Sequence, residues 1–331
     1  MESKIMKRTL LTLGFIFLLL GGCLPQKASP TPLPETETPV ATSTPTPPRF
    51  RVLAYVTEDT IPELIAYDKL THINYAFVLP RPDGSLRDVS NPWKLKKIIE
   101  TANPHGVKVL ISVGGWGLEK EFEAIAADPA IRAIFVQNLV NYAAEYQLHG
   151  VDIDWEYPVA GVSDGNYLAL MRELRAALPE NILLTTAVAA YGSNADGIPT
   201  EAFEVLDFVN LMVYDLSREA HATLAMAEQS LDYWQGRGLS VEKTVLGVPF
   251  YSRPGEIPYR KMVQADPAAA QVDEFEYAGA TQYYNGIPTM KAKTELALRR
   301  ASGIMFWALP QDTMDEYSLL AAIDQVVKSQ P

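Results

Sequence analysis

The chain lacks the side chains on which several kinds of site depend. Cys23 is its only cysteine, so it can form no internal disulfide and no zinc site built from several thiolates. Its four histidines are scattered, and none lies four residues from another: His72, His105, His149 and His221. We therefore expect no metal centre and no other cofactor.

Positive charge is also scarce. The 331 residues include 28 Lys and Arg against 40 Asp and Glu, a formal net charge of −12. A field of that sign repels phosphate backbones, so we expect no nucleic-acid partner. The length suits either two domains of about 150 residues or one (β/α)8 barrel of about 250 residues.

Residues 1–22 have the pattern of an export signal peptide. Three basic residues, Lys4, Lys7 and Arg8, precede an apolar run from Leu10 to Leu20. That run is about half of the roughly 20 residues that span a bilayer, which disfavours a permanent membrane helix. The four residues that end in Cys23, Leu-Gly-Gly-Cys, resemble the lipobox of bacterial lipoproteins. The resemblance implies that Cys23 is lipidated and anchors the exported protein to the outer face of the bacterial cell membrane. The alternative is an ordinary cleaved signal with an incidental cysteine.

Residues 23–48 predict a tether. Positions 24–48 hold eight prolines and six threonines and almost no large apolar side chains. Proline fixes φ and removes a backbone donor, so this stretch is expected to be extended and solvated rather than part of a core.

Residues 49–331 alternate short apolar runs with segments of helical periodicity. Asp128–Gln147 and Ser163–Leu178 have apolar residues at helical spacing, and in the first segment Asp128 is placed to cap and Pro129 to open the helix. Eight runs are predicted as strands: Arg51–Val56, His72–Val78, Val107–Val113, Gly150–Trp155, Ile182–Ala189, Asp207–Tyr214, Thr244–Phe250 and Gly303–Ala308.

This alternation predicts a parallel sheet buried on both faces. Eight strand and helix units favour a closed (β/α)8 TIM barrel over an open doubly wound sheet, for which the glycine-rich nucleotide turn after the first strand is missing. In such a barrel the chemistry takes place at the carboxyl ends of the strands.

The fourth strand brings three carboxylates together. A period of two puts Asp152, Asp154 and Glu156 on one side, with Ile153 and Trp155 on the other. A solvated acidic face fits poorly, because barrel strands have no solvent face, and a calcium loop would need a glycine turn and more ligands. Crowded acids titrate as a group, so one keeps its proton while another stays charged. Glycoside hydrolysis needs that pair, with Glu156 best placed to donate a proton and Asp154 to hold the charge.

These residues carry a resemblance to a known family. Asp152-Ile153-Asp154-Trp155-Glu156 resembles the Asp-x-Asp-x-Glu signature of family 18 glycoside hydrolases, the chitinases and endo-β-N-acetylglucosaminidases. Four further segments resemble the family in order and spacing: Ser112-Val113-Gly114-Gly115, Met212-Val213-Tyr214-Asp215, Gly247-Val248-Pro249-Phe250-Tyr251 and Trp307.

The resemblance implies substrate-assisted retaining catalysis on chitin or other β-1,4-linked N-acetylglucosamine chains. Glu156 would protonate the glycosidic oxygen, while the acetamido group of the sugar attacks its own anomeric carbon. Asp154 would orient that group, with Asp152 sharing a proton beneath it, and Tyr214 would hold the acetamido oxygen. Further substrate contacts are assigned to eight positions: Tyr55, Phe77, Gly115, Trp116, Tyr157, Met212, Asp215 and Trp307.

The sequence departs from the family pattern at three places. His149 stands where the longer motif begins with an aspartate, so the proton sharing beneath Asp154 would differ with its charge. Ser252 and Arg253 follow strand seven where many relatives have glycine and arginine, and no sugar contact is assigned to Arg253. Gly303 follows Tyr251 by 52 positions, which leaves no room for the large α+β insertion after strand seven and predicts a shallow, open groove.

Three functions remain open at this point. The first is a chitinase that acts as a monomer. The second is an endo-β-N-acetylglucosaminidase acting on N-glycans or peptidoglycan-type glycans. The third, from a different class, is a catalytically inactive barrel that binds glycans as a lectin does.

Overall fold

A computed structural model describes residues 50–217, 219 and 221–330. The predicted signal peptide (1–22), lipidated Cys23 and the tether (23–48) lie outside the described residues. Among the residues that the structure describes, no helix is both long and apolar enough to cross a membrane.

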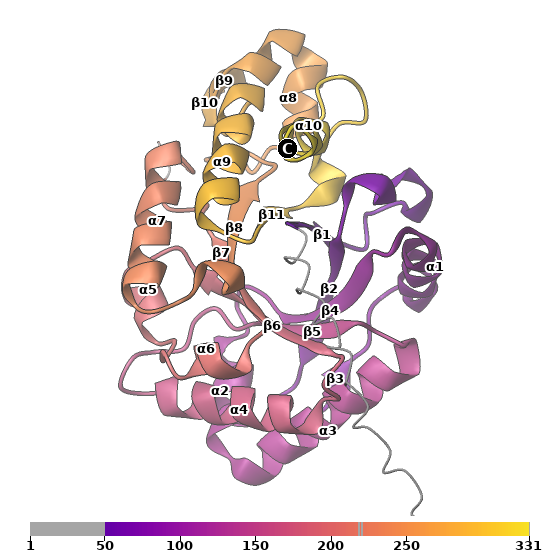
Figure 1. Ribbon diagram of the computed structural model, residues 1–331, viewed down its shortest axis with the longest axis vertical. Coiled ribbons are helices and arrows are strands. Elements are labelled where there is room, and N and C mark those ends of the chain that lie inside the picture. The colour runs from indigo at the N-terminus through magenta and orange to yellow at the C-terminus, as the bar shows by residue number, and fades with distance from the viewer. Residues whose placement is uncertain (1–49, 218, 220, 331) are drawn as a thin grey trace, which may run out of the picture. The chain divides into compact units, whose positions relative to one another are not determined.

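The described chain folds as a closed barrel of eight parallel strands with helices around it (Figure 1). The strands pair in the order β1-β2-β4-β5-β6-β7-β8-β11, and β11 returns to β1. The predicted (β/α)8 TIM barrel is therefore confirmed. The barrel strands are β1 (Arg51–Val56), β2 (His72–Pro80), β4 (Lys108–Gly114), β5 (Gly150–Asp154), β6 (Leu183–Ala189), β7 (Phe208–Met212), β8 (Thr244–Pro249) and β11 (Gly303–Trp307).

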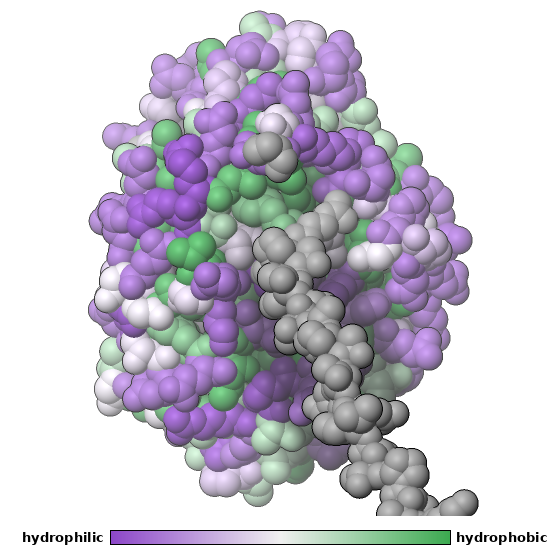
Figure 2. Space-filling view, in the orientation of Figure 1, coloured by the Kyte–Doolittle hydropathy of each residue, from purple (hydrophilic) through white to green (hydrophobic). Residues whose placement is uncertain are grey.

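The helices pack against the outside of the barrel. In the view of Figure 2, hydrophilic residues predominate on the surface that the helices form. The α-helices are α1 (Pro92–Ala102), α2 (Glu119–Ala127), α3 (Pro129–Tyr146), α4 (Asp164–Ala177), α5 (Ser193–Asp196), α6 (Ala202–Val205), α7 (Leu224–Gly236), α8 (Tyr259–Ala265), α9 (Ile287–Arg300) and α10 (Leu319–Lys328). Short 3₁₀ turns occur at Pro62–Leu64, Tyr67–Lys69, Asn103–His105, Val241–Lys243, Pro267–Gln271 and Leu309–Gln311.

The helix α3 shows how a capping aspartate and a following proline define the start of a helix. The carboxylate of Asp128 accepts hydrogen bonds from the backbone N–H groups of Ala130 (2.8 Å) and Ile131 (3.3 Å), so it satisfies two donors that the first turn leaves free. Pro129 takes the first helical position, where no intrahelical donor is needed. The helix ends at Tyr146, followed by Gln147 in the left-handed conformation.

Two antiparallel additions lie outside the barrel. The strand β3 (Leu86–Arg87) pairs with the end of β2, and β9 (Glu274–Tyr277) forms a hairpin with β10 (Ala280–Tyr283). The hairpin, α8 and α9 fill the segment between β8 and β11. That segment is described throughout and holds no large α+β domain, as predicted.

The apolar core has two parts, because alternate residues of each strand face opposite ways. One cluster fills the interior of the barrel and includes Leu53, Phe208 and Met305. The larger cluster lies between the strands and the helices and includes Val151 and Ile153 of β5. On β5, Asp152 and Asp154 alternate with Val151 and Ile153 and face the barrel interior. The strand therefore places its two acids inside the barrel.

Candidate active site

Asp152 is buried inside the barrel and accepts four hydrogen bonds. Its Oδ2 accepts from the hydroxyls of Tyr55 (2.7 Å) and Ser112 (2.9 Å), and its Oδ1 accepts from the Thr185 hydroxyl (2.6 Å) and the Asn210 amide (3.2 Å). Burial raises the pKa of this carboxyl, and the four donors oppose that rise. A carboxylate surrounded by donors on both oxygens has the partners that its charged form needs.

Asp154 lies only two residues beyond Asp152 on β5, but its hydrogen bonding and the shift of its pKa are different. Burial raises its pKa well above the usual range, and the charges of Glu156 and Asp152 raise it further. Its Oδ1 is buried and has no hydrogen-bond partner among the described residues. Of the two acids, Asp154 therefore has the surroundings that favour a proton more strongly, while the donors around Asp152 favour its charged form. Which of the two holds the charge stays a prediction.

Glu156 lies two residues beyond the end of β5, at the carboxyl edge of the barrel. Burial raises the pKa of its carboxyl, the negative charge of Asp215 adds to that rise, and a hydrogen bond with Tyr157 opposes it. An acid with a raised pKa keeps its proton to higher pH, which is the property of a general acid.

Tyr214 follows β7, where Met212 is the last residue of the strand. The Tyr214 ring packs edge-on against Tyr251, with centroids 6.3 Å apart, and its hydroxyl donates a long contact of 4.0 Å to the sulfur of Met305. Burial raises the pKa of this phenol, so its hydroxyl keeps its proton and can donate to an oxygen in the cavity.

Asp215 comes next in the chain and adopts the left-handed conformation, with φ 60°. Its Oδ1 accepts a hydrogen bond of 2.6 Å from the Nε of Arg253. Burial alone would raise the pKa of this carboxyl, but hydrogen bonds from Arg253 and Tyr251 outweigh that effect and lower it. Asp215 therefore stays charged at the edge of the site and helps to keep Glu156 protonated.

An aromatic floor closes the site from the side of β1, β2 and β11. The Trp307 ring stacks on Phe77 (centroids 5.5 Å apart, planes at 21°) and lies 5.6 Å from the Tyr55 ring. Gly115 has φ +98°, and a Cβ there would lie 2.9 Å from the Phe77 ring, so this glycine leaves space for the ring. Trp116 is 80% exposed at the opening.

These groups surround one cavity of about 800 Å³ at the carboxyl ends of the strands. Ten of the residues assigned from the sequence line it: Tyr55, Phe77, Trp116, Asp154, Glu156, Tyr157, Met212, Tyr214, Asp215 and Trp307. Asp152 and Gly115 lie behind this lining and support it. In the described residues, no group of three His, Cys, Asp or Glu side chains is arranged to hold a metal ion.

Part of the lining was not assigned from the sequence. The segment 189–194, from the last residue of β6 onward, forms one wall, and Leu216, Tyr251, Arg253 and Glu256 complete the site. Tyr251 stands in one of the matched family segments, which was a usable signal. The other residues belong to loops without a chemical pattern.

His149 does not join the carboxylate cluster. It precedes β5 at the amino edge of the barrel, and its Nδ1 accepts a hydrogen bond of 3.1 Å from the Val109 backbone N–H. Burial and the charge of Lys108 lower its pKa. A neutral ring at this place adds no charge beneath Asp154, whose pKa is raised by burial and by Glu156 and Asp152.

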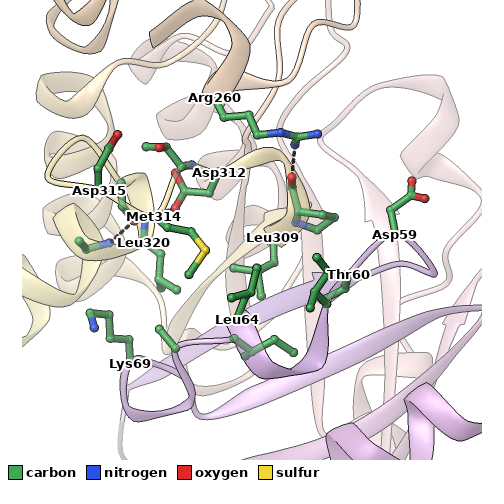
Figure 3. A pocket seen from close by; sticks show the side chains of 17 residues that line it. Asp59, Thr60, Leu64, Lys69, Arg260, Leu309, Asp312, Met314, Asp315 and Leu320 are labelled. Carbon is green, nitrogen blue, oxygen red and sulfur yellow. Dashed lines mark hydrogen bonds between the residues drawn. The ribbon is translucent and has the colours of Figure 1, made fainter. Parts of the chain in front are cut away.

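A second cavity of about 540 Å³ lies between the loops that follow β1 and β11 (Figure 3). Its most buried acid, Asp312, accepts hydrogen bonds from the backbone N–H groups of Leu319 (2.9 Å) and Leu320 (3.0 Å), so it caps α10. On the same side of the cavity, Arg260 donates to the carbonyl of Pro310. These polar groups are occupied in holding the loop, and none of the three acids of the β5 motif lines this cavity.

Comparisons with known proteins agree with this geometry. The model of the family "Glycosyl hydrolases family 18" matches residues 51–312. A probable endochitinase of Caenorhabditis elegans is 30% identical over 239 residues, which cover 60% of this chain and 38% of that protein. A chitinase-like effector of Moniliophthora roreri is 28% identical over 217 residues, which cover 56% of this chain and 53% of the effector. This chain thus spans about half or less of the length of these relatives.

Among solved structures, a chitinase from Bacteroides thetaiotaomicron superposes with a TM-score of 0.77 at 27% identity, covering 86% of this chain and 98% of that one. The family model covers most of the chain, and its matched range includes all eight barrel strands. The chain therefore belongs to glycosyl hydrolases family 18.

Proposed function

We propose that this protein is an active chitinase that cleaves β-1,4-linked N-acetylglucosamine chains with retention of configuration. The observation that carries the proposal is the unpartnered carboxyl oxygen of Asp154, which is buried in the wall of the cavity beside Glu156. A buried polar atom without a partner costs free energy unless a ligand supplies one. The acetamido N–H of the substrate is a donor of the required kind.

In the proposed reaction, Glu156 gives its proton to the glycosidic oxygen, and the bond to the anomeric carbon breaks. The acetamido oxygen of the same sugar attacks that carbon and forms an oxazolinium ring. The Tyr214 hydroxyl donates to the acetamido oxygen and Asp154 accepts from its N–H, so both ends of the group are held as charge develops. Glu156, now charged, then takes a proton from the water that opens the ring.

Support for chitin as the substrate comes from the relatives, which include named chitinases. The endo-β-N-acetylglucosaminidase reading remains the alternative, because it uses the same chemistry on another glycan. The products from a chitin hexamer and from a biantennary N-glycan separate the two. Cleavage of the hexamer alone supports a chitinase, and cleavage of the N-glycan alone would overturn this assignment.

The inactive, lectin-like alternative stays open, because one relative is named only chitinase-like. A fluorogenic chitotrioside decides between the two. We expect release of the fluorophore by the purified protein at pH 4–9. Bound oligosaccharide with no release across that range would make the protein a lectin.

We also propose that the protein works outside the cytoplasm, as a monomer fastened to the cell membrane by lipidated Cys23. The support is the sequence of residues 1–23 and the proline-rich stretch after it. Gel filtration of the chain from residue 49 onward tests the monomer, and a mass in multiples of the barrel would refute it.

A further inference from the structure

A lysine ammonium group lies completely buried behind the candidate active site. Lys293, on α9, is 0% exposed. Its Nζ donates to the backbone carbonyl of Ala222 (2.6 Å) and to the Oδ1 of Asn285 (2.7 Å). The Asn285 amide donates to the same carbonyl at 2.8 Å. Burying an ammonium group is costly, and nothing in the reaction described above uses this one.

The residue before Ala222 connects this lysine to the cavity. His221 is 1% exposed, and its Nδ1 accepts from the Asp215 backbone N–H at 3.2 Å. Its Nε2 lies 3.2 Å from the carbonyl oxygen of Tyr251. A backbone N–H can only donate and a carbonyl can only accept, so these partners assign the neutral ring with its proton on Nε2.

Protonation of that ring would disturb Asp215. A proton on Nδ1 would face the Asp215 N–H, and the hydrogen bond that holds this left-handed residue would be lost. The same proton would be directed to the Asp215 Oδ1, which is 3.5 Å away and already accepts from Arg253. Asp215 would then be drawn from the position in which it lines the cavity.

The groups around His221 shift the pKa of its ring in opposite directions. Burial lowers the pKa of the ring to about 4, Asp215 and the Tyr251 carbonyl act to raise it, and Lys293 and Arg253 lower it. Burial also lowers the pKa of Lys293 to about 7, while Asp273 opposes this. Lys293 is therefore cationic in acid, the range in which His221 would otherwise take up a proton.

We propose that Lys293 is a positioning residue for the catalytic cavity: it anchors the Ala222 carbonyl and sets a positive charge beside His221, which in turn holds the backbone of Asp215. The proposal rests on the proposed function, because Asp215 is placed there as the charged neighbour of Glu156. The residues that position the active site then include His221, which contacts Asp215, and Lys293 of α9.

The test compares Lys293→Met with Lys291→Met, a matched change on the same helix at a partly exposed lysine. Methionine keeps the length of the side chain and removes the charge. The imidazole ¹⁵N resonances of His221, assigned with His221→Gln, are followed from pH 3 to 8. We expect the midpoint of His221 to rise by about one pH unit in Lys293→Met and to stay unchanged in Lys291→Met.

A plot of kcat against pH with a chitotrioside should show the same shift on its acid side. Lys293→Arg keeps the positive charge, so it should bring the His221 midpoint part of the way back to the wild-type value. A purely structural lysine would lower stability without moving the His221 midpoint, and that result in a folded Lys293→Met overturns the proposal. If Lys293→Met does not fold, Lys293→Gln gives the same reading. The ¹⁵N titration needs no substrate, so it decides the role of Lys293 even if the wild type releases no product and the proposed function fails.

Discussion

Replacing Glu156 by glutamine separates binding from proton donation. Glutamine has the same shape and keeps an oxygen for the Tyr157 hydrogen bond, but it cannot give up a proton. A positioned general acid contributes about 10²–10⁴-fold, or about 2.7–5.4 kcal/mol of barrier, so kcat should fall by that factor while oligosaccharide affinity changes little. The change also removes a titrating carboxyl from a site crowded by Asp154 and Asp215, so thermal stability at pH 7 should stay equal or rise.

The assay is release from a fluorogenic chitotrioside, with affinity measured by calorimetry on the same preparations. Glu180→Gln, an exposed glutamate outside the cavity, is the matched control and should keep wild-type turnover. A Glu156→Gln protein that is folded and turns over at near the wild-type rate would show that the proton comes from another group.

Four more changes test other parts of the reasoning. The folded pKa of Asp154 lies above its ordinary value of 3.8, so the native state holds more protons and the free energy of unfolding falls as pH rises through the folded pKa. Asp154→Asn should flatten that fall in urea titrations at pH 4–8; an unchanged slope would refute the raised pKa. Gly115→Ala puts a Cβ 2.9 Å from the Phe77 ring at a positive φ, so we expect roughly 1–3 kcal/mol less stability and slower turnover. Trp116→Ala should weaken binding of long oligosaccharides by roughly 1 kcal/mol without changing the melting temperature, and equal binding would remove this contact from the site. Cys23→Ser should move the protein from the membrane fraction to the soluble fraction, and retention in the membrane would refute the lipid anchor.

The barrel was predictable because its signals are local and repeated. Each barrel strand is a continuous run of mostly apolar residues, and every predicted strand overlaps an observed one to within a few residues. The hairpin β9–β10 was missed, since Glu274–Tyr277 and Ala280–Tyr283 are short, partly exposed and paired only with each other. Strands of four residues give too short an alternation to stand out from a loop.

The candidate site was predictable where one strand fixes it. The period of two along β5 was enough to bring Asp152 and Asp154 to one side. The charge on each acid was not predictable, because it depends on Tyr55, Ser112 and Asn210, which come from three other strands. The same applies to Arg253, whose bond to Asp215 joins residues 38 positions apart.

The strand β1 runs from the point where the described chain begins to the rim of the cavity. Arg51 pairs with Gly303 at the amino end, and Tyr55 reaches the cavity at the other. The first described residues therefore lie at the base of the barrel, and the cavity mouth opens in the opposite direction. A group attached to the amino end of β1 would therefore lie at the end of the barrel opposite to the cavity mouth.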